Sequence, residues 1–433
     1  MRLKHLTEAI LNDWPGWLLI LLSFYIVMRF QKKWKDNNLT FALCFVLFMH
    51  HVVALTNTYL FIIHGADADA QKFQRLAVEW AASGKLLITG GAKFYQQLLG
   101  IFYRIFSPSH LFGEELSIIA FLFSCLILIK LIHLINLKKY QVGLLLMFGL
   151  LPTNLVLCSV TLRESYQMLF FMLSIYWGLR FYFMPTKGAM IFCIFSALIM
   201  GFFHRALILY MLFLLPLLFL WFPQKVSSSP VNRWRFSGKR FMIIGVILIL
   251  IIGILIIGIL LEIPGLDALA SVFSGKGLKY AVDYRTRLIF EKAPDARANY
   301  GILLDISSVG SLLKTTSLIY IYYLFAPFPW QIINWLDVYA FAESLLRFTL
   351  ILLSIITWHR SEGLQRSIWG LLLIIYFSMT LLWSTGTVNY GTSIRHHILS
   401  NWIIIIAGGS SLIAFLNQQY RKISQFMHSQ VLL

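Results

Sequence analysis

The sequence is poor in charge and in cysteine. Charged residues make up 12% of its 433 positions, whereas soluble domains carry about 25%. Hydrophobic residues make up 59% of the chain, and the mean hydropathy is +0.77. This balance excludes an ordinary soluble domain and indicates a protein that crosses a membrane several times. The four cysteines all lie in apolar runs, where we expect them to act as small hydrophobic residues rather than as disulfide partners or metal ligands.

Several motifs of soluble enzymes are also absent from the sequence. It has no Walker A loop, zinc signature, Gly-x-Ser-x-Gly elbow or dinucleotide fingerprint. The apolar runs are continuous rather than alternating over segments of about 10 residues, which excludes a transmembrane barrel. The net charge of +18 could suit nucleic acid, but many of the cations lie in short loops between apolar runs and no zinc knuckle or basic arm is present. We therefore expect a lipid bilayer as partner and no nucleic acid.

These features predict an all-α, polytopic transmembrane helix bundle of about 11 spans, with residues 1–433 forming a single integral membrane domain. The expected spans are 15–30, 41–63, 116–136, 142–160, 165–183, 188–204, 206–222, 241–261, 340–357, 367–385 and 397–416. Segment 317–335 is apolar but contains Pro327 and Pro329, so it could be a full span or a re-entrant hairpin.

The distribution of lysine and arginine predicts the orientation. The basic loops after the first, third, fifth, seventh, ninth and last spans become cytoplasmic if the N-terminus is outside and the C-terminus inside. Two long loops, 64–115 and 262–315, then face the extracytoplasmic side. Residues 73–80 and 94–103 have apolar positions at helical spacing, which favours interfacial helices lying on the membrane.

The same orientation brings ionic residues from five separate stretches to the extracytoplasmic face. Charge in or beside hydrocarbon is costly and marks a candidate functional site. Asp67 and Asp69 follow the second span; two acids at this spacing could hold a divalent cation, Mg²⁺ or Mn²⁺, or one could serve as a general base. Asp69 could also cap a helix over 70–80, and the two roles are compatible.

The connections between later spans supply the cations. Arg163 and Glu164 lie between the fourth and fifth spans, where they could form a structural ion pair or Arg163 could bind a phosphate. His204 and Arg205 occupy the tip of the next hairpin, as a snorkelling cation or as part of an anion site.

The remaining candidates lie in the second half of the chain. Arg395 and His396 follow a Gly- and Thr-rich turn at 386–393 and would face the same outer region. Arg285 and Arg287 alternate with tyrosine in the loop 262–315, which suits sugar and phosphate, although a solvated loop helix would have the same pattern.

The first long loop resembles that of the GT-C glycosyltransferases, and the resemblance covers about residues 60–185. It is carried by Asp69, Phe73, Ala77, Gly84, Tyr95, Gly100 and Tyr103, together with Leu151-Pro152 and Glu164. The resemblance implies a first-loop acid, Asp69 or Asp67, that acts as general base or metal ligand on a polyprenyl-phosphate sugar, so that 64–115 would be the catalytic loop. The chain differs from this family in having no large soluble C-terminal domain.

The Gly386-Thr387 to Arg395-His396 element is similar to bacterial O-antigen and exopolysaccharide polymerases, whose outer loops use arginines. Together, the resemblances imply a glycosyltransferase of a bacterial inner membrane. It would move a sugar or oligosaccharide from a polyprenyl-(pyro)phosphate donor to a glycan acceptor at the extracytoplasmic face. Arg163, Arg205 and Arg395 would stabilise the leaving phosphate. The alternatives are a repeat-unit polymerase or ligase, a transporter of polyprenyl-linked glycans, and a non-catalytic scaffold.

Overall fold

The computed structural model describes residues 10–63, 67–84, 90–221, 277–292 and 298–431. Within these ranges the chain is helical, without a strand, and this confirms the all-α prediction. Six helices are long and apolar enough to cross a membrane. They are α2 (Trp14–Trp34), α3 (Asn37–Tyr59), α6 (His110–Leu134), α16 (Trp335–Arg360), α17 (Gly363–Gly386) and α18 (Tyr390–Val431), the last as far as Arg421. The predicted span 241–261 and part of the loop 262–315 lie outside the described residues.

Shorter helices complete the described fold. They are α4 (Asp67–Ser83), α5 (Ala92–Ile105), α7 (Gln141–Gly149), α8 (Pro152–Leu157), α9 (Glu164–Phe183), α10 (Lys187–Phe203), α11 (Arg205–Leu220), α14 (Gly277–Arg287) and α15 (Val309–Phe325), with the single-turn η1 (Lys138–Tyr140), η2 (Leu288–Lys292) and η3 (Pro329–Gln331). Side-chain caps fix several helix starts, because the first backbone N–H groups of a helix lack internal partners. Asp36 accepts from Leu39 N at the start of α3, and Ser109 accepts from Phe112 N at the start of α6.

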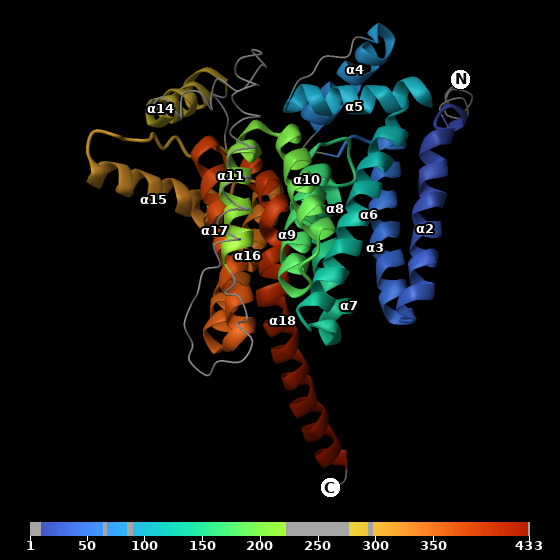
Figure 1. Cartoon of the computed structure of the whole chain (residues 1–433), viewed down its shortest axis with the longest axis vertical. Coiled ribbons are helices and arrows are strands. Elements are labelled where there is room, and N and C mark those ends of the chain that lie inside the picture. Colours follow the sequence, from blue (N-terminus) through green and yellow to red (C-terminus); the bar gives the residue numbers. More distant parts are fainter. Residues whose placement is uncertain (1–9, 64–66, 85–89, 222–276, 293–297, 432–433) are drawn as a thin grey trace.

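The long helices run up and down, so the connections between them gather at two ends of the bundle (Figure 1). We call the end that carries α4 and α5 the loop end. The opposite end receives the connections 34–37, 134–141, 183–187 and 360–363, and we call it the basic end. It contains cations that the sequence placed in cytoplasmic loops, among them Lys33, Lys138, Lys187 and Arg360.

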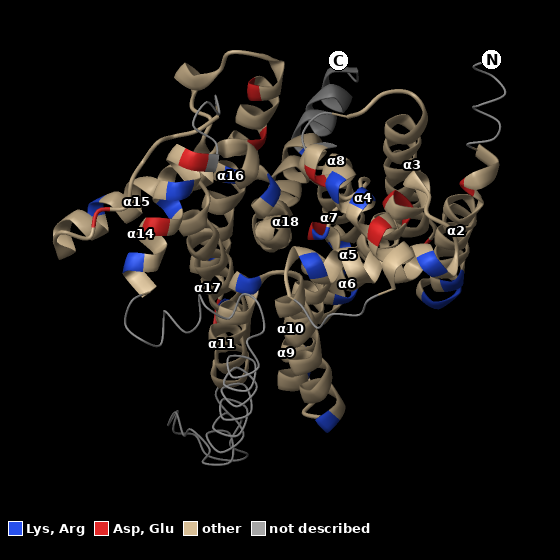
Figure 2. Ribbon diagram, turned by 90° about the horizontal axis from the view of Figure 1, so that it is seen from above, with Lys and Arg blue, Asp and Glu red and all other residues tan. Residues whose placement is uncertain are grey.

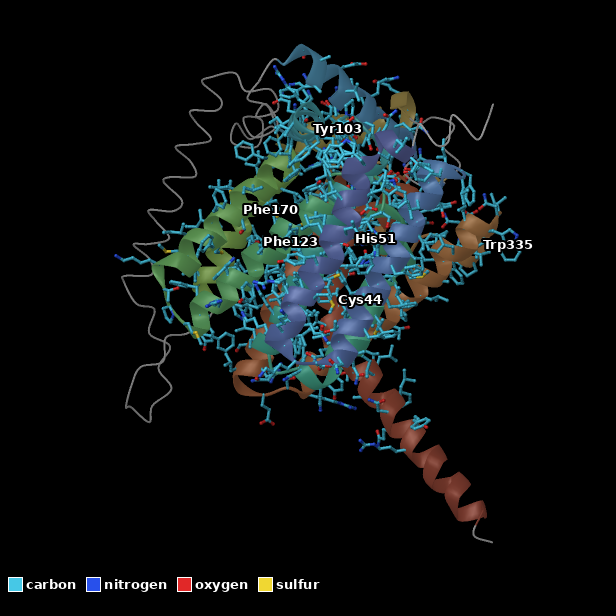
Figure 3. The ribbon with its side chains drawn as sticks, turned by 90° about the vertical axis from the view of Figure 1, so that its right-hand side faces the viewer. Cys44, His51, Tyr103, Phe123, Phe170 and Trp335 are labelled. Carbon is cyan, nitrogen blue, oxygen red and sulfur yellow. The ribbon has the colours of Figure 1, made fainter. Side chains whose placement is uncertain are left out.

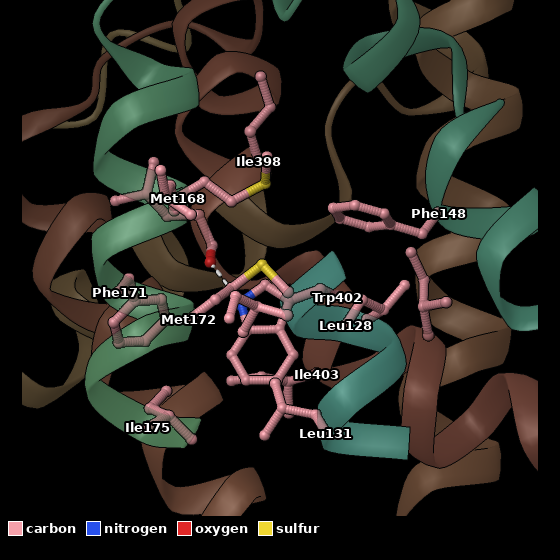
Figure 4. Close-up of a cluster of buried hydrophobic side chains, with 14 of the residues drawn as sticks. Leu128, Leu131, Phe148, Met168, Phe171, Met172, Ile175, Ile398, Trp402 and Ile403 are labelled. Carbon is pink, nitrogen blue, oxygen red and sulfur yellow. Dashed lines mark hydrogen bonds between the residues drawn. The ribbon is translucent and has the colours of Figure 1, made fainter. Parts of the chain in front are cut away.

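The centre of the bundle is formed by α6, α9 and α18, whose side chains interlock (Figure 4). Met168, Met172 and Trp402 are buried there, with Phe148 of α7 beside them. Lipid removes most of the hydrophobic drive between helices, so close packing has to hold such a bundle together. Gly408 of α18 permits one close approach, because a Cβ at this position would lie 2.2 Å from Leu350 O of α16.

Helices α4 and α5 pack against each other and lie across the loop end (Figures 1 and 2). The glycine of α5 allows this contact: a Cβ on Gly100 would lie 2.5 Å from a ring carbon of Trp80 and 2.9 Å from Ala77 O. Phe73 and Tyr95 are buried and meet edge to face, with their ring centroids 5.2 Å apart. Helices are therefore present in the first long loop, as the sequence pattern indicated, and several residues that carry its resemblance hold the two helices together.

The predicted span 142–160 is not a single helix, and neither is the segment 317–335, which the sequence predicts to be a full span or a re-entrant hairpin. Segment 142–160 is divided into α7 and α8, because Pro152 starts a new helix and cannot continue the preceding one. Segment 317–335 is not one helix: α15 ends at Phe325, the 3₁₀ turn η3 follows, and α16 begins at Trp335. Helix α15 runs across the bundle rather than along it (Figures 1 and 2).

Candidate functional site

Three helix starts that are distant in sequence meet at the loop end, and each contributes an ionic side chain. Asp69 comes from the first turn of α4, Glu164 from that of α9 and Arg395 from the second turn of α18. Arg395 lies between the two acids: its Nη1 contacts Asp69 Oδ2, and its Nη2 is 2.7 Å from Glu164 Oε1. Figure 2, which looks onto this end, shows charged segments gathered around α4, α5 and α18. We call Asp69, Arg163, Glu164 and Arg395 the ionic cluster.

The two acids of the ionic cluster differ in accessibility. The side chain of Glu164 is 2% exposed, whereas that of Asp69 is 52% exposed. Glu164 Oε1 accepts from both Nε and Nη2 of Arg395, which fixes the guanidinium plane. Arg395 contacts Asp69 through Oδ2, and no described residue is bonded to Oδ1. Glu164 therefore positions Arg395, and Asp69 is the acid that a ligand could reach.

Arg163 is the second cation of the cluster. Its Nε is 3.9 Å from Glu164 Oε1, beyond hydrogen-bonding distance, and its Nη1 donates a long bond of 3.4 Å to Phe203 O. Burial lowers the pKa of Arg163, and the charge of Glu164 opposes this effect. The buried Nε has no hydrogen-bond partner in the described part of the chain. Two acids and two arginines leave the cluster balanced, with donors on Arg163 that an anion could use.

Two histidines and a tryptophan form an aromatic wall next to the cluster. His396 stacks on Trp383 with ring centroids 4.1 Å apart, and His204 meets the same indole at 4.6 Å. Burial and the nearby cations, first of all Arg163, lower the pKa of His204 well below its ordinary value. His204 Nδ1 accepts from Ala206 N at 3.2 Å, which assigns the proton of this neutral ring to Nε2.

The proton of His396 follows from its partner. The Thr387 hydroxyl donates to Trp383 O, so it has to accept from His396 Nδ1 at 2.9 Å. This leaves Nε2 of His396 as an acceptor. The aromatic wall therefore offers one N–H donor and one nitrogen acceptor, and such a polar, flat surface could contact a sugar.

Arg205 lies on the hairpin between α10 and α11, close to the start of α5. Gly91 N donates to Phe202 O at 2.7 Å, which docks α5 on this hairpin. Gly91 has φ +75°, and a Cβ there would lie 3.9 Å from Arg205 Cγ. The charge of Arg205 also acts on His204. The predicted residue Arg205 therefore lies at the border of the same site.

Arg285 has a different role from the predicted binding of phosphate. It is 1% exposed, and its Nε donates to Ile302 O at 2.6 Å. Its Nη1 donates to three backbone carbonyls where α17 ends, those of Ser384, Thr385 and Thr387. Arg285 thus holds α14 and segment 298–302 against the end of α17, and burial lowers its pKa to about 10. Arg287 is exposed and bonds only to Asp283 O among the described contacts.

A neighbour of Arg285 does reach the ionic cluster. Tyr284 interacts electrostatically with Arg163, and its ring lies near Gly386, where a Cβ would be 3.5 Å from Tyr284 Cε1. Burial raises the pKa of the Tyr284 hydroxyl. Helix α14 therefore brings a neutral hydroxyl and an aromatic ring to the site, and the alternation of Tyr and Arg in the sequence was the signal for it.

The described acids do not form a divalent-cation site. No group of three or more His, Cys, Asp or Glu side chains with metal-ligand geometry occurs in the described ranges, and Asp69 Oδ2 is engaged by a guanidinium. The side chain of Asp67 lies outside the described residues, so the predicted Asp67–Asp69 cation site stays a prediction.

A second polar group lies inside the bundle. His51 of α3 bonds Glu115 of α6, with His51 Nδ1 2.9 Å from Glu115 Oε2, and Ser23 of α2 contacts His51 Nε2 at 2.9 Å. His51 precedes the end of α3 by eight residues, or about 12 Å at 1.5 Å per residue. Figure 3 shows His51 in the body of the bundle, below Tyr103. We call these three residues the buried triad.

Other polar side chains inside the bundle are paired in a similar way. Glu114 accepts from Asn57 and from Thr58, and Glu343 of α16 accepts from Thr153 of α8. His51 and Glu343 therefore place ionic groups inside the bundle as well as at the loop end. The acids at 114 and 115 precede the predicted span 116–136, and their charge caused them to be assigned to the loop, although α6 starts at His110.

Comparisons of the chain with protein-family models, curated proteins and solved structures found no match.

Proposed function

We propose that this protein is a membrane glycosyltransferase that uses a lipid-linked donor. It would transfer a sugar or oligosaccharide from a polyprenyl-(pyro)phosphate to a glycan acceptor, at the extracytoplasmic face of a bacterial inner membrane. The observation that carries the proposal is the arrangement of a half-exposed Asp69 against Arg395, which a buried Glu164 holds in place. The resemblance of the segment around Asp69 to GT-C enzymes supports the same chemistry.

The proposed reaction is a displacement at the anomeric carbon. An acceptor hydroxyl forms a new C–O bond to that carbon, while the bond to the phosphate oxygen breaks and the leaving (pyro)phosphate keeps its electron pair. The proton of the acceptor passes to the carboxylate of Asp69. Arg395 and Arg163 meet the negative charge that develops on the leaving oxygen, and such preorganised charge lowers the barrier.

Before the donor binds, Arg395 holds the Asp69 carboxylate in an ion pair. A phosphate that engages Arg395 competes with Asp69 for Nη1, whereas Glu164 still holds Nε and Nη2. Donor binding would therefore release the Asp69 carboxylate without displacing the arginine. The aromatic wall of His204, His396 and Trp383 lies beside the cluster and would contact the sugar.

The test is an incubation of the purified full chain with a polyprenyl-linked glycan pool and a glycan acceptor, followed by product masses. An added sugar or oligosaccharide that Asp69→Asn fails to form supports the transferase. Equal product from both proteins would contradict the assignment of Asp69. The absence of any covalent product over a range of pH and divalent cations would contradict the transferase itself.

A repeat-unit polymerase or ligase is the second candidate, and the central position of Arg395 favours it. In this reading arginines bind the lipid pyrophosphate and no metal takes part. The same product masses distinguish the two: a single addition indicates a transferase, whereas a ladder of repeat units indicates polymerisation.

A transporter of lipid-linked glycans is the third candidate, favoured by the polar groups inside the bundle. Those groups are bonded to one another across helices, as in Ser23–His51–Glu115, and such bonds hold membrane helices together. Movement of labelled donor across proteoliposomes, without a change of mass, would support transport over transfer.

A further inference from the structure

A cavity lies at the basic end of the bundle, far from the ionic cluster. Its volume is about 560 Å³, within the range of small-molecule sites. It is formed where α2, α6 and α9 end, together with η1. The lining includes four cations, Lys33, Lys130, Lys138 and Arg180, and apolar walls from Trp34 and Phe183.

The cations around this cavity have no acidic partner in the part of the chain that the structure describes: none of the four forms an ion pair there, and no Asp or Glu lines the cavity. Lys130 is also repelled by the charges of Lys33 and Arg180. Asp36, at the same end of the bundle, caps α3 and accepts from Gln141 instead. The cavity thus concentrates uncompensated positive charge.

Two general effects place cations at such positions, and neither supplies them with an anionic partner. Helix C-termini favour a cation in the last turn, and cytoplasmic loops are basic. Aromatic rings offset part of this charge at two of the four cations: Lys130 Nζ is 5.9 Å from the Tyr176 ring centroid, and the Arg180 guanidinium is 5.1 Å from that of Trp177. The four cations still repel one another across the cavity, and a bound anion would offset that repulsion.

We propose that this cavity binds a phosphate-bearing group, most directly the headgroup of an anionic membrane lipid. Arg180 is prepared for this role, because its Nη1 donates to Tyr176 OH at 3.1 Å, which orients the guanidinium. A guanidinium fork matches phosphate oxygens, and the lysines add point charges. Trp34 and Phe183 lie beside the charges and would contact the first acyl carbons. The site is independent of the reaction proposed at the loop end.

The test measures lipid binding to the delipidated full chain by native mass spectrometry. Short-chain phosphatidylglycerol is compared with phosphatidylcholine, for the wild type and for Lys130→Gln/Arg180→Gln. The matched control is Lys139→Gln, because Lys139 is exposed at the same end and does not line the cavity. We expect selective binding of phosphatidylglycerol, a Kd at least tenfold weaker in the double variant and no change in the control.

A second double variant, Lys33→Gln/Lys138→Gln, changes two exposed residues that line the cavity. It tests the site even if the first double variant fails to fold, and we expect it to weaken lipid binding too.

Millimolar inorganic phosphate forms the second arm of the experiment. Phosphate that binds or displaces the lipid supports the site with free phosphate as a source; lipid binding that phosphate cannot displace supports the headgroup. Equal binding of both lipids without phosphate binding, or equal loss in Lys139→Gln, would overturn the proposal.

Discussion

The ionic cluster and the buried triad use similar residues for different purposes. In the triad, His51 and Glu115 are 4% and 0% exposed, and their contacts join α2, α3 and α6. In the cluster, Glu164 is equally buried, but Asp69 is half exposed. The difference teaches that an ionic residue in a membrane bundle is a candidate for chemistry when part of its group remains accessible, and is structural when its partners enclose it.

The largest effect that separates the two regions should come from Asp69→Asn. Loss of a general base costs about 10²–10⁴ in rate, whereas an exposed ion pair contributes about 0–1 kcal/mol to stability. We expect transferase activity to fall at least 100-fold with an almost unchanged melting temperature. Glu79→Gln is the control, because Glu79 is an exposed acid on the same helix. A similar loss of activity in both variants would show that Asp69 has no special role.

In the buried triad, Glu115→Ala should affect stability rather than chemistry. It leaves His51 without its acid, and an unsatisfied buried polar group costs about 1–3 kcal/mol. We expect a lower midpoint of thermal unfolding in detergent and normal specific activity of the folded fraction. Glu362→Ala, an exposed acid at the basic end, serves as control. Unchanged stability of Glu115→Ala would remove the distinction between triad and cluster.

Arg395→Lys retains the charge between Asp69 and Glu164 but removes the fork that Glu164 orients. We expect about a tenfold drop in kcat/KM, since one point charge cannot bond both acids and a phosphate in the same plane. Kinetics against donor concentration, with stability measured in parallel, check this. A variant with full activity would mean that only the charge of Arg395 matters.

The smallest effect concerns pH. His204 is neutral in the folded protein because burial lowers its pKa below 6.5, whereas in the unfolded chain it gains a proton below about pH 6.5. Its contribution to stability is therefore complete above pH 6.5 and is lost as the pH falls toward the folded pKa. His204→Asn retains an acceptor for Ala206 N and should weaken this acid destabilisation, by less than about 1.4 kcal/mol per pH unit. Unfolding midpoints between pH 5 and 7 test it.

A comparison of predicted and observed helices shows how much of the fold could be inferred from the sequence. Long apolar runs predicted the all-helical fold class correctly, because a bilayer leaves backbone groups no partners outside helices or closed barrels. The predicted span 142–160 differs because Pro152 restarts the helix. The start of α6 was placed too late because Glu114 and Glu115 looked like loop residues, and only their partners on α3 account for their burial.

The sequence by itself determined an all-helical membrane protein and suggested Asp69, Arg163, Glu164 and Arg395 as candidates, since composition and periodicity are local properties of the chain. The tertiary structure alone decided that Arg395 lies between Asp69 and Glu164, which precede it by 326 and 231 residues. It also made Arg285 a structural residue and left four cations around one cavity. Such relations depend on how helices pack, and packing is set by side-chain contacts between segments that sequence periodicity treats separately.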